Sequence, residues 1–335
     1  MKGKPSVLSL FAGIGGICQS FTEAGCEISL ANEIDHYACQ TYRNSYSHPL
    51  IEGDIRDLHA KSDIKDSIDL IVGGFPCQPF SQAGNQLGFE DPQGRGLLFF
   101  EIMRLVDELI VADEKPKALF LENVGRLETI DEGNTYARIV SEIEQRGYKV
   151  RCNTYDDTHN RIHGYVLNSK DYSGIPHNRN RIYIVAQDEE ICNAPFKPIS
   201  KVKPSPLSAF LDNKEKAEER YYRNEYNSKH YDLFLREITK ENTIYQYRRY
   251  YVRENKNGLC PALTANMGAG GHNVPMIKDS YGIRKLTEDE CLRFQGLRGI
   301  QFPEKMASGH KYKQIGNSVT VPVVRSIAKN LIKTL

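Results

Sequence analysis

Residues 6–24 read SVLSLFAGIGGICQSFTEA, and this stretch decides the fold. Its mostly apolar start predicts a buried strand over Ser6–Leu10. The turn Phe11–Gly16 follows, and an amphipathic pattern then predicts a helix over Gly16–Ala24. Glycines at such a turn let the backbone bend sharply and let a ligand approach the main chain. A strand, a glycine-rich turn and a helix in this order are typical of the ligand-binding edge of an open α/β sheet.

The alternation of strands and helices continues to about residue 189. Further strands are predicted at Glu27–Ala31, Ile68–Val72, Ala118–Leu121, Tyr148–Cys152 and Arg181–Ala186. Helical patterns lie between them, at His36–Tyr42, Leu97–Val111 and Thr135–Gln145. This order predicts an α/β fold with a doubly wound, mostly parallel sheet.

The pattern changes near Pro195. Four prolines within residues 195–206 indicate a linker. The stretch Pro195–Lys256 carries 14 Lys and Arg against 9 Asp and Glu, and it holds eight of the 19 tyrosines. Basic residues interleaved with aromatic ones favour a nucleic-acid surface, although a solvated face of mixed charge explains so modest an excess equally well. Helical patterns return at Leu286–Phe294 and at Val319–Ile332.

Bulk composition narrows the class of protein. A chain of 335 residues suggests about two domains. It has no apolar run of the ~18 residues that a membrane span requires, and its first residues lack the apolar region of a signal peptide. The eight cysteines are scattered without a CxxC pair, which argues against a zinc site and a disulfide framework. We therefore expect a cytoplasmic protein with no metal and no membrane partner.

Two acidic residues follow successive predicted strands. Glu33 lies twenty residues after Gly13, where a carboxylate can accept hydrogen bonds from ribose hydroxyls. Asp54 follows a short apolar approach and can accept from an adenine amino group. Each acid alone is more typical of a surface-loop carboxylate, but together, at successive strand ends, they indicate a nucleoside site. The turn has the spacing GxGG rather than GxGxxG, which disfavours a pyrophosphate cradle and a nicotinamide-dependent dehydrogenase.

A single cysteine stands out in residues 73–81, GGFPCQPFS. Cys77 follows a proline just past the predicted strand Ile68–Val72, so we expect it on a rigid loop at the carboxyl end of that strand. A thiol held in this way suits covalent catalysis. The alternative is that Cys77 is an ordinary small buried hydrophobic residue.

Taken in order, the motifs resemble those of the C5-cytosine DNA methyltransferase family over nearly the whole chain. They are FAGIGG (11–16), Glu33 with Asp35, Gly53-Asp54-Ile55, GFPCQPFS (74–81), RGLLFF (95–100), LENV (121–124), RNRIYIVA (179–186), RKLTEDECLRFQG (284–296) and QIGNSV (314–319). Any one of them can occur by chance, but the complete order is highly specific.

The resemblance implies the class I S-adenosylmethionine-dependent methyltransferase fold with a second, smaller target-recognition domain. The catalytic and cofactor-binding domain would comprise residues 1–189 and 305–335, and the target-recognition domain residues 190–304. The implied methyl donor is S-adenosyl-L-methionine. Its implied binding residues are Phe11, Gly13, Ile14, Gly15, Gly16, Glu33, Ile34, Asp54, Ile55, Pro76, Leu98, Asn317 and Ser318.

The resemblance also implies catalytic roles for four residues. Cys77 would add to C6 of a cytosine that is flipped out of the duplex, which makes C5 nucleophilic. Glu122, in its protonated form, would donate a hydrogen bond or proton at N3, and such a carboxyl needs a raised pKa. Arg181 would contact the base O2, and Arg179 would stabilise the pocket around Cys77 and Glu122.

Double-stranded DNA is the implied partner, and two groups of residues are expected to contact it. Ser81 and Gln82 belong to a glycine-containing loop, residues 82–94, that would close over the flipped base, although an ordinary flexible connection fits the same residues. In the recognition segment the donors expected to contact bases or phosphates are Arg248, Arg249, Arg253, Asn266, His272 and Asn273. For the loop 266–273, a glycine-rich turn with polar surface residues is nearly as good an interpretation.

The sequence departs from the family pattern at His177, where the family usually has glutamine before the two arginines. The imidazole can still donate a hydrogen bond, and its protonation would add a pH dependence. We interpret the chain as a bacterial enzyme of the restriction–modification type, monomeric on DNA, with a cognate restriction endonuclease as a functional but not physical partner. The alternatives are a tRNA cytosine-5 methyltransferase and a catalytically impaired DNA-binding relative.

Overall fold

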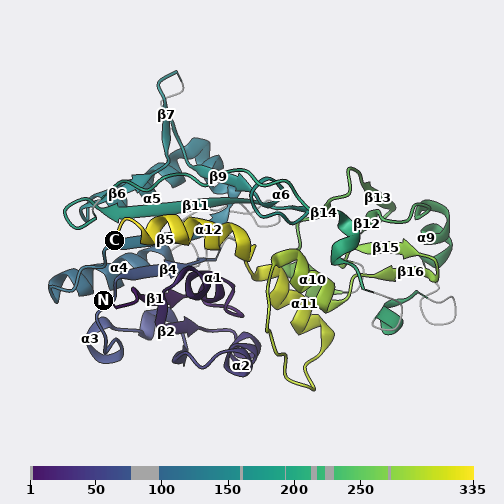
Figure 1. The fold of residues 1–335 in the computed structure, drawn as a ribbon, viewed down its shortest axis with the longest axis horizontal. Coiled ribbons are helices and arrows are strands. Elements are labelled where there is room, and N and C mark those ends of the chain that lie inside the picture. Colours follow the sequence, from purple (N-terminus) through teal and green to yellow (C-terminus); the bar gives the residue numbers. More distant parts are fainter. Residues whose placement is uncertain are drawn as a thin grey trace. The chain divides into compact units, whose positions relative to one another are not determined.

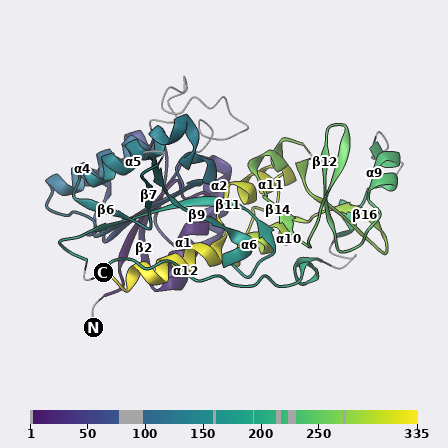
Figure 2. The ribbon, with the colours of Figure 1, turned by 90° about the horizontal axis from the view of Figure 1, so that it is seen from above.

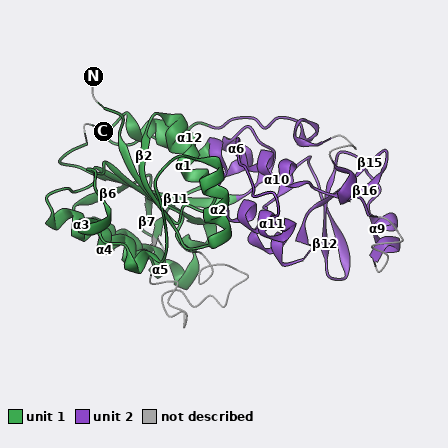
Figure 3. Ribbon diagram, turned by 90° about the horizontal axis from the view of Figure 1, so that it is seen from below, with its two compact units in different colours: residues 1–167, 180–200, 323–335 green, residues 168–179, 201–322 purple. Residues whose placement is uncertain are grey.

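The chain folds into two compact units, which Figure 3 shows in different colours. Unit 1 comprises residues 1–167, 180–200 and 323–335, and unit 2 comprises residues 168–179 and 201–322. The computed structural model describes residues 3–76, 98–158, 161–192, 194–212, 217–222, 230–270 and 273–335. Cys77, Ser81, Gln82 and His272 therefore lie outside the described residues.

Unit 1 is built around an eight-stranded sheet in the order β3-β2-β1-β4-β5-β11-β6, with β9 pairing with β11 (Figure 1). The neighbouring strands β3, β2, β1, β4 and β5 pair in parallel, whereas β11 runs antiparallel to both β5 and β6. The prediction of a mostly parallel α/β sheet is confirmed. The strands are β1 (Ser6–Leu10), β2 (Glu27–Glu33), β3 (Leu50–Glu52), β4 (Leu70–Gly73), β5 (Ala118–Val124), β6 (Tyr148–Arg151), β9 (Tyr165–Asn168) and β11 (Asn180–Asp188).

Helices cover both faces of this sheet. In Figures 2 and 3, α1 and α12 lie on one face, and α4 and α5 lie on the other. The central strands are apolar throughout because both faces are covered, and Phe21 of α1 packs edge-on against Phe120 of β5 with ring centroids 5.3 Å apart. The helices of this unit are α1 (Gly16–Ala24), α2 (His36–Ser45), α3 (Ala60–Asp63), α4 (Leu98–Val111), α5 (Asn134–Glu144) and, from residue 323 onward, α12 (Val321–Ile332).

Unit 1 also carries a small β-hairpin that stands apart from the main sheet. Its strands β7 (Thr154–Asp156) and β8 (Arg161–His163) pair antiparallel and project from the rest of the unit in Figure 1. The sequence analysis did not predict this hairpin, nor the short strand β3, because neither is long enough to show a hydrophobic period.

Unit 2 contains a four-stranded antiparallel sheet in the order β13-β12-β15-β16. Helix α9 (Tyr231–Glu237) contributes Phe234 to the core of this sheet, where it meets Tyr245, Met276 and Ile283. Tyr247 also belongs to this core, so part of the tyrosine-rich stretch serves packing rather than a polar surface. The strands are β12 (Ile244–Arg248), β13 (Tyr251–Asn255), β15 (Met276–Asp279) and β16 (Gly282–Lys285).

The rest of unit 2 is held together by close backbone packing. A Cβ on Gly316 of α11 would lie 2.1 Å from the carbonyl carbon of Thr264, and one on Gly268 would lie 2.4 Å from the carbonyl oxygen of Gly309. Only glycine permits these approaches, so α11 sits directly on the short helix η10 (Ala265–Ala269). The other elements are α6 (Ser169–Tyr172), β10 (His177–Asn178), η7 (Leu207–Phe210), η8 (Glu218–Arg220), β14 (Cys260–Pro261), α10 (Glu288–Gln295) and α11 (Ser308–Asn317).

Candidate active site

The glycine-rich turn after β1 has a left-handed backbone at three positions, two of which are glycines. Phe11, Gly13 and Gly15 all have positive φ, of 53°, 56° and 82°. The turn is closed by a hydrogen bond of 2.9 Å from the N–H of Gly15 to the carbonyl of Ala12. A Cβ on Gly15 would lie 2.3 Å from the Tyr46 ring, so a side chain is excluded there. Helix α1 begins directly after this turn, at Gly16.

Glu33 ties the end of β2 to this turn. Its Oε2 accepts a hydrogen bond of 2.7 Å from the N–H of Gly13, and its Oε1 accepts from the N–H groups of Ile34 and Asp35 at 2.9 and 2.8 Å. Burial raises the pKa of Glu33, while these three donors act in the opposite direction. The carboxylate is thus fixed at the carboxyl edge of the sheet, where the sequence analysis expected a ribose contact.

Other predicted cofactor residues lie on the neighbouring strand ends. Ile34 follows β2 and is 61% exposed, an unusual position for a large apolar side chain. Asp54 begins the short helix η1 (Ile55–Asp57), where its Oδ1 accepts from the N–H of Arg56 at 3.0 Å. Ile55 is buried in the core, as is Ile14 in the turn. The structure therefore brings the turn, Glu33 and Ile34 together and gives Ile55 and Ile14 a packing role.

The loop that leads from β4 toward Cys77 is described as far as Pro76. Phe75 is buried and packs against Phe99 of α4, with ring centroids 5.8 Å apart. Its carbonyl accepts a hydrogen bond of 3.3 Å from Nδ2 of Asn123 on β5. These contacts hold the base of the loop against the end of β5. Leu98, another predicted cofactor residue, is the first residue of α4 and packs against the core.

Glu122 and Arg181 meet because β11 runs antiparallel to β5. Tyr183 lies opposite Glu122 in this pairing, and side chains two residues apart share a face, so Arg181 lies diagonally beside Glu122. The Nε of Arg181 is 2.8 Å from Oε1 of Glu122. Both side chains are largely buried, with 15% and 10% of their surface exposed.

The other oxygen of Glu122 faces the loop that leads to Cys77. A Cβ on Gly74 would lie 3.2 Å from Oε2 of Glu122, so this carboxylate stands directly beside the loop's second glycine. The contact between Arg181 and Oε1 lacks hydrogen-bond geometry, and the described residues offer this oxygen no other hydrogen bond. A buried carboxylate that is only partly satisfied is a common feature of sites that bind a polar ligand.

Arg179 and His177 have their contacts within unit 2. The guanidinium of Arg179 donates to the carbonyls of Leu263, Gly316 and Ser318, the last two at 3.2 and 2.6 Å. Nε2 of the buried His177 accepts from the N–H of Leu263 at 3.2 Å. Arg179 thus fixes the backbone on both sides of Asn317, which is exposed at the end of α11. The role predicted for Arg179 in the pocket around Cys77 stays a prediction.

Ser318, a further predicted cofactor residue, directly follows α11. Its side chain is buried, and its hydroxyl has no hydrogen-bond partner among the described residues. Its carbonyl accepts from Arg179 and, at 3.3 Å, from Nε2 of Gln295. The sequence analysis placed Arg179 and Ser318 in different roles, and the structure joins them.

The predicted DNA-contacting arginines lie on the hairpin of β12 and β13. Arg253 lies opposite Gln246, and Arg248 lies opposite Tyr251, so these four side chains share the face turned away from the core. Arg248, Arg249 and Arg253 are all exposed, and Tyr250 at the tip of the hairpin is 82% exposed. The hairpin therefore presents a basic and aromatic face.

Part of the second predicted DNA-contacting segment, residues 266–270 and 273, is described. Asn266 is exposed on the short helix η10, and Asn273 donates its N–H to the carbonyl of Gly270 at 3.1 Å. Gly268 of this segment serves close packing against α11. At least one of the four glycines is thus explained by the fold, and Asn266 remains exposed.

Two features that the sequence analysis missed complete the description. Tyr46 donates a hydrogen bond of 3.3 Å to the carbonyl of Gly15 and thereby stabilises the glycine-rich turn. No sequence motif marks it, because it lies in the connection after α2. Among the described residues, no group of three or more His, Cys, Asp and Glu side chains is placed to hold a metal, and no helix is long and apolar enough to cross a membrane.

The fold is that of solved methyltransferases. The structure aligns with a methyltransferase of Entamoeba histolytica, EhMeth, with a TM-score of 0.73, 18% identity and 99% of each chain covered. It aligns similarly with a Spodoptera frugiperda DNMT2 variant, with a TM-score of 0.72, 19% identity and coverage of 98% of this chain and 99% of that one. At these identities the likeness establishes the fold.

The sequence comparisons define the family. Residues 6–333 match the family model for C-5 cytosine-specific DNA methylases. The chain is 43% identical over 332 residues to the Type II methyltransferase M.Bsp6I of Bacillus sp. (strain RFL6). This alignment covers 98% of this chain and 99% of that relative. It is 37% identical to the Type II methyltransferase M.HaeII of Haemophilus aegyptius, covering 98% and 93%. The chain belongs to the C-5 cytosine-specific DNA methylase family, a family of DNA cytosine-5 methyltransferases.

Proposed function

We propose that this protein transfers a methyl group from S-adenosyl-L-methionine to C5 of a flipped-out cytosine in a short, specific site of duplex DNA. The observation that carries the proposal is the Glu122–Arg181 pair, which stands beside Gly74 at the start of the loop that bears Cys77. A carboxyl group and a guanidinium suit the polar edge of a cytosine, and the cysteine suits its C6.

The residues of the turn fit the proposed cofactor. Glu33 offers carboxylate oxygens at the end of β2, Gly13 and Gly15 leave the main chain open to approach, and the exposed Ile34 offers an apolar surface to an adenine ring. Further proposed contacts come from Phe11, Asp54, Pro76, Leu98, Asn317 and Ser318. When bound, S-adenosylmethionine would supply the methyl group, with cleavage of its sulfur–methyl bond, and would leave as S-adenosylhomocysteine.

Cys77 is the proposed nucleophile. Its thiolate forms a bond to C6 of cytosine, and the electron pair of the C5–C6 double bond moves so that C5 becomes nucleophilic. Glu122 neutralises the charge that develops at N3 by donating a proton or hydrogen bond there, and Arg181 holds O2. After C5 carries the methyl group, a base removes the C5 proton and the thiolate leaves from C6, which restores the aromatic ring.

The proposed division of roles follows the sequence analysis. Residues 1–189 and 305–335 would carry catalysis and cofactor binding, and residues 190–304 would recognise the target. Within the second segment, the exposed face of the β12–β13 hairpin is the proposed reading surface, because a two-stranded ribbon fits the major groove and arginine pairs with guanine. Asn266, His272 and Asn273 are proposed as further contacts, and Ser81 with Gln82 as contacts to the flipped nucleotide.

We further propose that the protein acts as a monomer on DNA in the cytoplasm, where it protects host DNA from a cognate restriction endonuclease. The Type II methyltransferase names of its relatives support this role. Bisulfite sequencing of DNA from a host that expresses the protein would identify the methylated site.

The decisive test is Cys77→Ser. We expect this variant to lose methyl transfer while it retains duplex binding, because only the nucleophile is changed. Wild-type protein should also be trapped covalently on DNA that carries 5-fluorocytosine, since fluorine at C5 blocks the final elimination. Full activity of Cys77→Ser, or no trapping of the wild type, would contradict the mechanism.

A further inference from the structure

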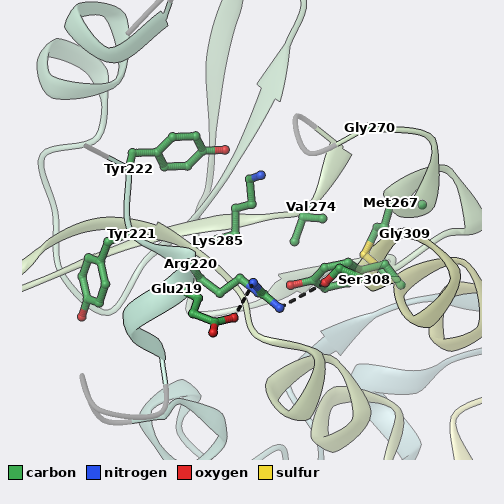
Figure 4. A pocket seen from close by; sticks show the side chains of 12 residues that line it. Glu219, Arg220, Tyr221, Tyr222, Met267, Gly270, Val274, Lys285, Ser308 and Gly309 are labelled. Carbon is green, nitrogen blue, oxygen red and sulfur yellow. Dashed lines mark hydrogen bonds and ion pairs between the residues drawn. The ribbon is translucent and has the colours of Figure 1, made fainter. Parts of the chain in front are cut away.

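Unit 2 contains a cavity of about 220 Å³ that none of the proposed roles uses (Figure 4). Its wall is formed by η8, by the end of β16, by η10 and by the start of α11. Two cationic side chains, Arg220 and Lys285, line it together with Tyr222 and Val274. The cavity therefore combines positive charge with apolar and aromatic surface.

Arg220 is committed to the wall of the cavity. Its Nε and Nη2 donate to the two oxygens of Glu288 at 3.2 and 2.7 Å, and Nη2 also donates to Oγ of Ser308 at 3.1 Å. Although Glu288 is buried, the hydrogen bonds from Ser308 and Arg220 hold its pKa below the usual range. The charges of Arg220 and Glu288 neutralise each other, and the contacts with Glu288 and Ser308 link η8 to α10 and α11.

Lys285, unlike Arg220, makes no hydrogen bond or ion pair with the described residues. Figure 4 shows it rising between Tyr222 and Val274, away from the contacts of Arg220, and its Nζ lies 5.4 Å from the centroid of the Tyr222 ring. No hydrogen bond or ion pair of this ammonium is found among the described residues, since the nearby Glu288 already receives Arg220 and Ser308. Burial lowers the pKa of Lys285, with the charge of Arg220 acting in the same direction.

Glu288 acts on this half-buried ammonium only through its charge and without direct contact, so an anion in the cavity would stabilise the ammonium further. The position of the cavity indicates which anion. Its wall includes Met267 and Gly268 of η10, the element that presents Asn266 to solvent. Unit 2 also carries the exposed arginine face of the β12–β13 hairpin.

We infer that this cavity binds a phosphate group of the DNA backbone, with Lys285 as its charged contact. The inference rests on the proposed function, because it assumes duplex DNA as the ligand of unit 2. Such a contact carries no base information and instead sets the position of the protein along the duplex. Arg220 and Glu288 then act as the rigid wall against which Lys285 is held.

The test compares Lys285→Met and Lys285→Arg with the wild type in duplex binding over a range of salt concentrations. Each phosphate contact contributes about 0.9 to the slope of log affinity against log salt. We expect Lys285→Met to lower this slope by about one, and to weaken binding by roughly three- to tenfold equally for specific and unrelated duplexes. Lys285→Arg should retain most of the wild-type slope. Lys240→Met is the matched control, because Glu254 already neutralises Lys240 at 2.9 Å.

A second measurement identifies the phosphate. Duplexes in which one linkage at a time is an uncharged methylphosphonate are scanned across the site. At the contacted linkage the wild type should lose affinity several-fold, while Lys285→Met should lose nothing more. An unchanged salt slope for Lys285→Met, or no linkage at which the two proteins differ, overturns the phosphate site. The proposed function still stands in that case if the wild type methylates duplex DNA. A wild type that neither binds nor methylates duplex DNA overturns both.

Discussion

Two arginine–glutamate pairs in this molecule have the same chemistry and opposite environments. In unit 2, Arg284 and Glu290 form two parallel hydrogen bonds of 2.9 and 2.8 Å, with side chains that are 1% and 0% exposed. In unit 1, Nε of Arg181 lies 2.8 Å from Oε1 of Glu122 without hydrogen-bond geometry, and the side chains are 15% and 10% exposed. The difference lies in how completely each pair is surrounded by further partners.

The Arg284–Glu290 pair is closed on every side. The other N–H groups of Arg284 donate to Asp279 and to the carbonyls of Lys285 and Asp212. The two oxygens of Glu290 also accept from the N–H groups of Thr287 and Asp212, at 2.6 and 2.7 Å. All five guanidinium N–H groups therefore have acceptors, and no capacity is left for a ligand.

The Arg181–Glu122 pair has far fewer hydrogen-bond partners than the Arg284–Glu290 pair. Apart from Glu122, the described residues offer Arg181 only the carbonyl of Asn180, at 2.7 Å. Donor groups of Arg181 and an oxygen of Glu122 thus remain for a substrate. An arginine–glutamate pair whose groups are all satisfied stabilises the fold, whereas a pair with unused donors and acceptors near the end of a strand can bind a ligand.

The largest expected effect is on the closed pair. Glu290→Gln keeps the shape of the side chain but leaves the charge of Arg284 buried without its counter-ion. We expect unit 2 to lose about 3–5 kcal/mol of unfolding free energy. Urea unfolding followed by circular dichroism measures it, and a transition for unit 2 that does not move would show that the pair is not structural.

Glu122→Gln should behave in the opposite way. The amide keeps the shape of the side chain and cannot supply the proton at N3, so we expect turnover to fall by about 10²-fold or more. The loss of unfolding free energy should be about 1 kcal/mol or less, because the pair is only partly satisfied. Methyl transfer to duplex DNA and S-adenosylmethionine affinity are measured together. Unchanged turnover, or lost cofactor affinity, would contradict the proposed role of Glu122.

The sequence predicted the open pair better than the closed one. Glu122 and Arg181 follow from motifs that resemble the family, and their strands were placed to within about three residues of β5 and β11. Nothing in the residues 284–290 says that Arg284 turns into the core while Lys285 faces a cavity. Adjacent residues of β16 have opposite faces, and which face is buried depends on contacts distant in sequence, such as that with Asp212.

Other elements show the same limit. The run Ser6–Leu10 and the helix Gly16–Ala24 were predicted with their observed bounds, because each has its own apolar pattern and glycines bound the helix at both ends. The antiparallel direction of β11 and the hairpin of β12 and β13 depend on pairing between strands, which hydrophobic periodicity does not encode. Cys77 lies outside the described residues, so its placement and its role stay predictions.

The smallest effect on stability is expected at a third, more exposed arginine–glutamate pair, which tests whether the distance between the charges or their burial matters. Arg325 of α12 and Glu23 of α1 lie 2.7 Å apart, at the same spacing as the pairs above, but with side chains 33% and 29% exposed. Solvent already screens this pair, so Glu23→Gln should lower the unfolding free energy of unit 1 by about 0.5 kcal/mol or less and leave turnover unchanged. Raising the salt concentration should shrink even that difference, because exposed charges are screened. A loss as large as that expected for Glu290→Gln would mean that the distance between the charges, rather than their burial and the completeness of their partners, sets the contribution of all three pairs.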